Sequence, residues 1–162
     1  MKKKNKILLI YLLTASGIVA WLCIIFLAPY LKSRSFGLNT YIYSLCSPFC
    51  HQIPSRSFVI FHHPLAVCAR CLGIYFGFLA GVVFYPFVRG FSEISLPKLK
   101  TFFFISLPIV IDTLGNLFLW ATPGWIRLLL GVIWGFILPF YFIAGLADYF
   151  VNIKKLRSKN KS

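Results

Sequence analysis

Residues 72–88 read LGIYFGFLAGVVFYPFV, an uncharged and mostly apolar run with three evenly spaced glycines. A helix needs about 20 predominantly apolar residues to cross the hydrocarbon core of a bilayer. The run therefore predicts a membrane span, which residues 66–71 complete. Gly73, Gly77 and Gly81 lie on one face of such a helix, where small side chains let backbones approach closely. We expect this face to pack within one helical bundle, with a dimer interface as the alternative.

Similar apolar runs lie on both sides of this stretch, and they predict four spans in all. Their ranges are about 7–31, 66–88, 101–120 and 127–148. The first run follows a cluster of lysines, but it is longer than the roughly 7 to 15 apolar residues of a signal peptide, which predicts a retained anchor.

Composition leads to the same fold class. The chain is 59% hydrophobic and 12% charged, whereas soluble domains are about 45–50% apolar and about 25% charged. So much apolar and aromatic content also excludes a disordered chain. We predict an all-α membrane protein that forms a single integral membrane domain over residues 1–162. It has four transmembrane helices and a Cys/His-rich first extramembrane loop, residues 32–67.

The distribution of Lys and Arg predicts the orientation, because cytoplasmic segments carry an excess of both. With the N-terminus inside, twelve Lys and Arg lie in inner segments and five in outer ones. We therefore expect a multi-pass protein of the cell (cytoplasmic) membrane with both termini in the cytoplasm. Most of the net charge of +14 lies beside the spans, where it favours anionic lipid headgroups. The predicted partner is the lipid bilayer and not nucleic acid, with a homo-oligomer through the glycine seams as an alternative.

Four of the five cysteines and all three histidines lie within residues 46–71. Zinc favours four Cys or His ligands in a tetrahedron, commonly from one close pair and a second group farther along the chain. Cys68 and Cys71 have the two-residue spacing of such a pair, and Cys50 and His51 can supply the other ligands. Zinc is accordingly the predicted cofactor. The residues that could replace one of these ligands are Cys46, His62 and His63.

The same thiols allow a different chemistry, that of a membrane thiol-disulfide oxidoreductase. Cys68 and Cys71 would lie at a helix start, where the helix dipole and Arg70 favour the thiolate. Cys46 and Cys50 would then form a partner pair, with a quinone as electron acceptor. Inert structural thiols or a single disulfide are a third interpretation. An oxidising outer face favours the redox chemistry, and an inverted topology would favour zinc.

Asp112 lies at position 12 of the predicted span 101–120, where an unpaired charge costs about 2.5–3.5 kcal/mol. Asn116 lies one turn away on the same face, and Arg70 and Arg127 lie at the outer ends of neighbouring spans. With Arg56, these residues predict a polar cavity at the outer mouth. It could serve a small transporter or a binder of lipid headgroups, or Asp112 could be a protonated or salt-bridged structural lock.

Three motifs resemble the signature of a prokaryotic membrane-protein family, the domain of unknown function numbered two thousand and eighty-five. They are Cys50-His51-Gln52, Arg56-Ser57-Phe58 and residues 68–78, CARCLGIYFGF. The resemblance covers roughly residues 50–135 and is weaker at Pro108, Asp112, Arg127, Gly131 and Gly135. It implies that the polar motif residues are Cys50, His51, Arg56, Cys68, Arg70, Cys71, Asp112 and Arg127. It implies no activity, so the sequence assigns no enzymatic reaction.

Overall fold

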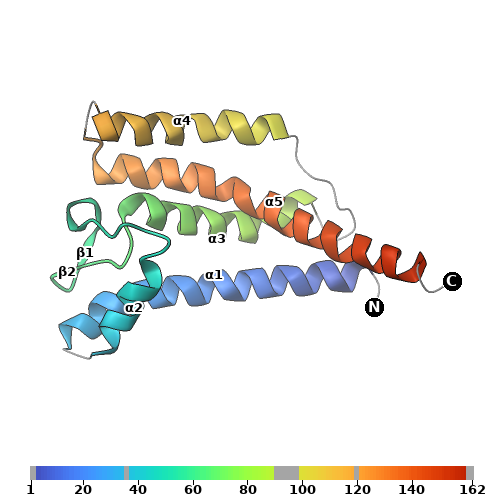
Figure 1. The fold of residues 1–162 in the computed structure, drawn as a ribbon, viewed down its shortest axis with the longest axis horizontal. Coiled ribbons are helices and arrows are strands. Elements are labelled where there is room, and N and C mark those ends of the chain that lie inside the picture. Colours follow the sequence, from blue (N-terminus) through green and yellow to red (C-terminus); the bar gives the residue numbers. More distant parts are fainter. Residues whose placement is uncertain (1–2, 35–36, 90–98, 119–120, 160–162) are drawn as a thin grey trace.

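Four long helices run side by side along the molecule (Figure 1). The computed structural model describes residues 3–34, 37–89, 99–118 and 121–159, with side chains within 4–34, 37–88, 99–116 and 121–150. Its elements are α1 (Lys3–Ser33), α2 (Leu38–Cys46), the 3-10 turn η1 (Pro54–Arg56), β1 (Val59–Ile60), β2 (His63–Pro64), α3 (Ala69–Arg89), α4 (Leu99–Phe118) and α5 (Gly124–Lys159).

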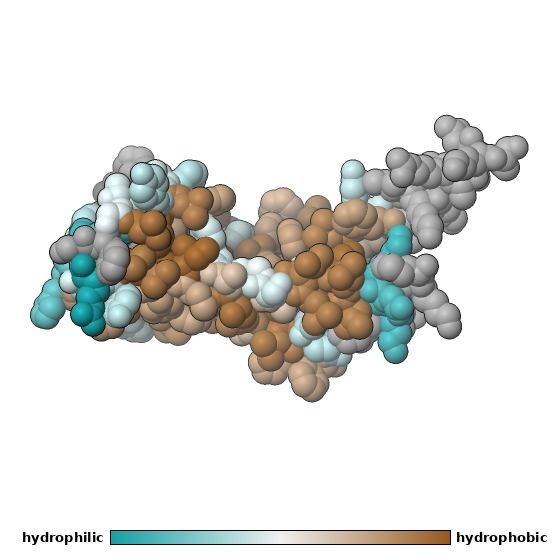
Figure 2. Space-filling model, turned by 90° about the horizontal axis from the view of Figure 1, so that it is seen from below, coloured by the Kyte–Doolittle hydropathy of each residue, from teal (hydrophilic) through white to brown (hydrophobic). Residues whose placement is uncertain are grey.

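The predicted fold class is confirmed. Helices α1, α3, α4 and α5 are long and apolar enough to cross a membrane, and apolar surface dominates between two hydrophilic ends (Figure 2). Large side chains such as Leu13, Phe104 and Ile133 stay exposed along these helices, as expected where lipid replaces water. Helix α3 begins three residues later than predicted, and α5 continues beyond residue 148. Trp120, the predicted end of the third span, lies outside the described residues.

Helices α3 and α5 share the largest interface between any two elements, and glycines line it on both sides. A Cβ atom added at Gly73 would lie 2.1 Å from the carbonyl oxygen of Leu128, and one added at Gly135 would lie 2.2 Å from that of Ile74. No side chain fits in that space. The glycines with equally close contacts across this interface are Gly77, Gly81 and Gly131. The expectation that these glycines pack within one helical bundle is thus met by the contact between α3 and α5.

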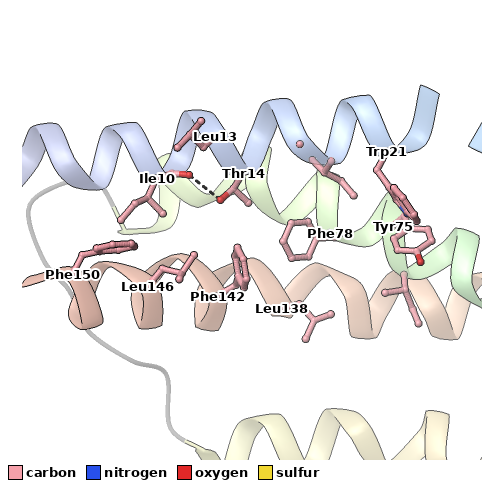
Figure 3. A pocket seen from close by; sticks show the side chains of 13 residues that line it. Ile10, Leu13, Thr14, Trp21, Tyr75, Phe78, Leu138, Phe142, Leu146 and Phe150 are labelled. Carbon is pink, nitrogen blue, oxygen red and sulfur yellow. Dashed lines mark hydrogen bonds between the residues drawn. The ribbon is translucent and has the colours of Figure 1, made fainter. Parts of the chain in front are cut away.

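Helix α1 leaves an apolar groove beside α3 and α5 (Figure 3). The groove has a volume of about 640 Å³. Its lining includes Thr14, whose hydroxyl hydrogen is donated to the Ile10 carbonyl at 2.8 Å and so is not available as a donor to the groove. One end is formed by Trp21 and Tyr75, whose rings meet edge to face at 6.0 Å.

The first extramembrane loop is folded, because it contains α2, η1 and the β1–β2 hairpin. Phe61 and His62 have φ angles of 52° and 63°, and they form the two-residue turn in which both positions are left-handed, as hairpin turns of this length favour. The Phe61 ring contacts Tyr30 near the end of α1. After the hairpin, the chain buries Leu65, Ala66 and Val67 in a core shared with α1. The Cys/His-rich segment is therefore held against the bundle.

The glycine seam gives a testable prediction about stability. Replacing Gly135 with Ala places a methyl group against the backbone of α3, and overpacking of this kind costs about 1–3 kcal/mol. Gly145→Ala is a matched control on the same helix, because nothing lies within 4 Å of its added Cβ. We expect Gly135→Ala to lower the melting temperature in detergent and Gly145→Ala to leave it unchanged or raise it. Equal melting temperatures would contradict the packing described here.

Candidate functional site

Three cysteine sulfurs meet at the end of the bundle where α3 and α5 begin. The Sγ atoms of Cys50, Cys68 and Cys71 all lie within 4.8 Å of one another. We call these three residues the sulfur cluster. Cys50 follows α2, Cys68 directly precedes α3, and Cys71 lies in the first turn of α3. The cluster therefore joins the folded loop to a membrane-spanning helix.

Local backbone geometry sets the position of Cys50. Its N–H donates to the Cys46 carbonyl at 3.1 Å, which continues the end of α2. Two residues later Gln52 adopts a φ of 50°, a left-handed conformation that turns the chain. The Gln52 amide holds this turn by donating to the Tyr43 carbonyl at 2.6 Å. Cys50 Sγ is then within reach of the next segment and accepts the Cys68 N–H at 3.1 Å.

The pKa values of the cluster thiols are shifted in different directions. Hydrogen bonds from the Cys50 and Cys71 thiols hold the pKa of Cys68 well below its usual range, and the backbone N–H groups of Cys71 and Arg70 add to this effect. The hydrogen bond to Cys68 raises the pKa of Cys50 in turn. Burial raises the pKa of the Cys46 thiol. These contacts therefore favour the thiolate at Cys68, and a thiolate is the form of cysteine that binds metals and attacks disulfides.

The other sulfur and imidazole groups lie outside this cluster. Cys46 is completely buried in the core shared with α1. His51 is exposed, yet it lines a cavity of about 430 Å³ together with all three cluster cysteines. His62 and His63 lie on the hairpin. Of the predicted zinc ligands, the structure therefore brings the three cysteines together and leaves the His51 side chain beside them.

The polar residues of α3, α4 and α5 form one hydrogen-bonded network beside the sulfur cluster. Arg70 forms an ion pair with Asp112 and donates to the Thr113 hydroxyl at 2.8 Å. The Asn116 side-chain amide donates to Asp112 Oδ1 at 2.9 Å. Arg127 donates to Asn116 Oδ1. Four residues of the predicted polar cavity thus contact one another in a chain, and the fifth, Arg56, lines the cavity beside Arg70 and Arg127.

Asp112 lies in the half of α4 that is nearer the sulfur cluster, six residues before Phe118, the last described residue of the helix. Its partner Arg70 is the second residue of α3. Asp112 is 7% exposed, and its ion pair with Arg70 offsets the cost of burying it.

Thr122 also belongs to this network, although the sequence did not identify it. Its hydroxyl donates to Asp112 Oδ1, and its backbone N–H donates to Asn116 Oδ1 at 3.0 Å. It lies in the short connection before α5, directly before Pro123 and Gly124. A hydroxyl residue just before a Pro-Gly helix start often forms hydrogen bonds with nearby backbone groups. Nothing in the sequence identifies Asp112 as the acceptor of this one.

A second cavity lies on the other side of Arg56 and Arg127. Its volume is about 370 Å³. Arg56 and Arg127 line both cavities and so form the wall between them. The other residues of the second cavity include Ser55, Ser57, Thr122, Ala69 and Gly124.

Comparison with known proteins assigns the family. Residues 50–141 match the family described as "Predicted membrane protein (DUF2085)". The chain belongs to the DUF2085 family. It is 36% identical over 141 residues to the "Uncharacterized protein MJ1492" of Methanocaldococcus jannaschii, covering 82% of this chain and 90% of that protein. No solved structure matches the chain.

The DUF2085 match begins at Cys50 and ends within α5. It thus contains the whole sulfur cluster, the Arg70–Asp112 pair and the glycine seam, whereas α1 and α2 lie outside it. The family resemblance drawn from the cysteine and arginine motifs is confirmed. The matched region of this DUF2085 protein therefore contains both the sulfur cluster and the polar network beside it.

The Arg70–Asp112 pair of this DUF2085 protein can be tested with a double-mutant cycle. Asp112→Leu leaves the mostly buried Arg70 without its carboxylate, and breaking a buried pair in this way costs about 3–5 kcal/mol. Combining it with Arg70→Met removes the stranded charge. We expect the double variant to lose less unfolding free energy in detergent than the sum of the two single variants. Strict additivity would show that the pair is not coupled.

Proposed function

We propose that this membrane protein binds a soft divalent metal ion, zinc above others, at the sulfur cluster. The observation that supports it is the approach of three sulfur atoms to within 4.8 Å of one another. Zinc–sulfur bonds of about 2.3 Å in a tetrahedron place sulfurs about 3.8 Å apart. The cluster therefore needs only a small contraction to accept the ion. Three thiolates are also the donors that zinc prefers to harder cations.

His51 is our proposed fourth ligand. It neighbours Cys50 and lines the cavity shared by the three cysteines, so a rotation of its exposed side chain can bring the imidazole toward the sulfurs. A bound zinc would stabilise the fold and supply a Lewis acid at this cavity. The cysteines would hold the loop against the start of α3, and Arg70 and Arg127 would keep the adjoining wall of the cavity positively charged.

We propose that the protein lies in the cytoplasmic membrane with both termini in the cytoplasm. The excess of Lys and Arg in the inner segments supports this orientation. The start of α1 and the end of α5 lie at one end of the bundle, and the sulfur cluster lies at the other (Figure 1). The proposed metal site would then face the outside of the cell.

A second candidate function is that of a membrane thiol oxidoreductase, in which Cys68 and Cys71 form a disulfide and their two electrons and two protons reduce a quinone to a quinol. The apolar groove favours it, because the end formed by Trp21 and Tyr75 adjoins the sulfur cluster. The Trp21 ring contacts Phe49 at 5.6 Å, and the Cys71 thiol lies 4.0 Å from the Phe49 carbonyl oxygen. The groove could thus place an apolar oxidant close to Cys71 through its Trp21 end.

Metal analysis of the detergent-purified protein distinguishes the two candidates. We expect a single zinc per chain, and thiols that resist alkylation until a chelator is added. Cys68→Ser and Cys71→Ser should lose the metal, because each removes a ligand. Cys23→Ser is the matched control, since Cys23 is exposed on α1. Protein purified with reductant that contains no metal, and whose Cys68 and Cys71 form a reversible disulfide, would overturn the metal proposal and favour the redox candidate.

The role of His51 has a separate test. His51→Ala should retain the metal when purified, because three cysteine ligands remain, but it should release the metal to a chelator faster than the parent protein does, because one ligand is lost. His62→Ala is the control, because His62 lies at the exposed tip of the hairpin. If both variants release metal at the same rate as the parent protein, His51 is not a ligand.

A further inference from the structure

Arg127 is a buried cation without a carboxylate of its own. The residue is 7% exposed, and its guanidinium donates from Nη2 to the neutral amide oxygen of Asn116. Its Nε is buried and has no hydrogen-bond partner within the described part of the chain. Arginine is almost never fully buried unless it is paired. This arrangement therefore indicates that something absent from the polypeptide completes the site.

The Asp112 carboxylate does not pair with Arg127, because it already binds other donors. It accepts hydrogen bonds from Arg70, Asn116 and Thr122, and its ion pair is with Arg70. Of the two other acids in the sequence, Asp148 lies far along α5 from Arg127, and Glu93 lies outside the described residues. A zinc ion on three thiolates would add one negative charge. Arg56, Arg70 and Arg127 still leave one positive charge unbalanced.

The second cavity concentrates further positive potential at the same place. Helices α3 and α5 both begin there, and a Cβ added at Gly124 would lie 3.9 Å from the Cβ of Ala69. The N-terminus of a helix offers N–H groups and a partial positive charge, which together bind anions. At α3 the N–H groups of Arg70 and Cys71 already bind Cys68 Sγ, so the start of α5 is the one that can donate here. Ser55 adds a hydroxyl to the lining, whereas Thr122 donates to Asp112. Two arginines, the start of α5 and the Ser55 hydroxyl thus surround one cavity.

We propose that this second cavity binds a phosphate group. A phosphate offers several charged oxygens that can accept from guanidinium and backbone N–H groups at once, and a volume of about 370 Å³ accommodates it. The group can come from a free phosphate or from the headgroup of a phospholipid, because the cavity lies at the ends of the membrane-spanning helices. This inference does not depend on metal at the sulfur cluster.

Phosphate binding to the full chain in detergent tests the proposal, with inorganic phosphate as the probe. Charge-assisted hydrogen bonds contribute about 1.5–3 kcal/mol, so Arg127→Gln should weaken binding roughly tenfold to a hundredfold. Arg56→Gln should also weaken it, and because Arg56 is exposed this variant keeps the test valid if Arg127→Gln does not fold. Arg34→Gln is the matched control, an exposed arginine outside the cavity.

Native mass spectrometry with phosphatidic acid distinguishes the two sources of phosphate. Retention of the lipid that inorganic phosphate displaces, and that Arg56→Gln reduces more than Arg34→Gln, would support the site with a lipid headgroup as ligand. Binding of inorganic phosphate without retention of the lipid would support it with a free anion. If neither ligand responds to Arg56→Gln or Arg127→Gln more than to Arg34→Gln, the proposal is overturned, whatever the metal content of the protein.

Discussion

The close contact between the backbones of α3 and α5 is the constraint on which the rest of the site depends. Lipid gives helices no hydrophobic reason to associate, so packing at small residues must hold them together. At Gly131 the contact reaches the carbonyl of Arg70, where an added Cβ would lie at 2.3 Å. The first turns of both helices are thereby fixed side by side. Cys71 and Arg127 share one cavity because their helices can touch there.

Asp112 links the paired helices α3 and α5 to a third helix, α4. It connects α4 to α3 through its ion pair with Arg70, and to the start of α5 through Thr122 and Asn116. Each added partner lowers the cost of the buried carboxylate, and the carboxylate in turn lowers the cost of Arg70. Arg127 has no ion pair within the described residues. Its guanidinium donates to a neutral amide oxygen, and Asp112 and Cys68 act on its charge only at longer range. That imbalance is what distinguishes a site for an external ligand from a purely structural lock.

Much of this arrangement could be predicted from sequence, because its causes are local. Hydropathy alone places the spans, and the spacing of Cys68 and Cys71 brings their sulfurs together on one helical turn. The contribution of Cys50 followed from composition, since such a concentration of thiols has little packing purpose. The side-chain direction of His51 could not be predicted, because it depends on the left-handed turn at Gln52. Likewise, the surroundings of Asp112 could not be predicted, because they depend on Thr122 in the connection before α5.

The two chemical sites share a wall, so neither is electrostatically independent. Arg56 and Arg127 line the cavity of the sulfur cluster on one side and the second cavity on the other. Charges a few ångströms apart at the edge of a protein interact by several kcal/mol at an effective dielectric constant of about 20. Thiolates at the cluster therefore stabilise the arginines and weaken their hold on an anion across the wall. Neutral thiols, or a disulfide, would leave the arginines free to attract that anion more strongly.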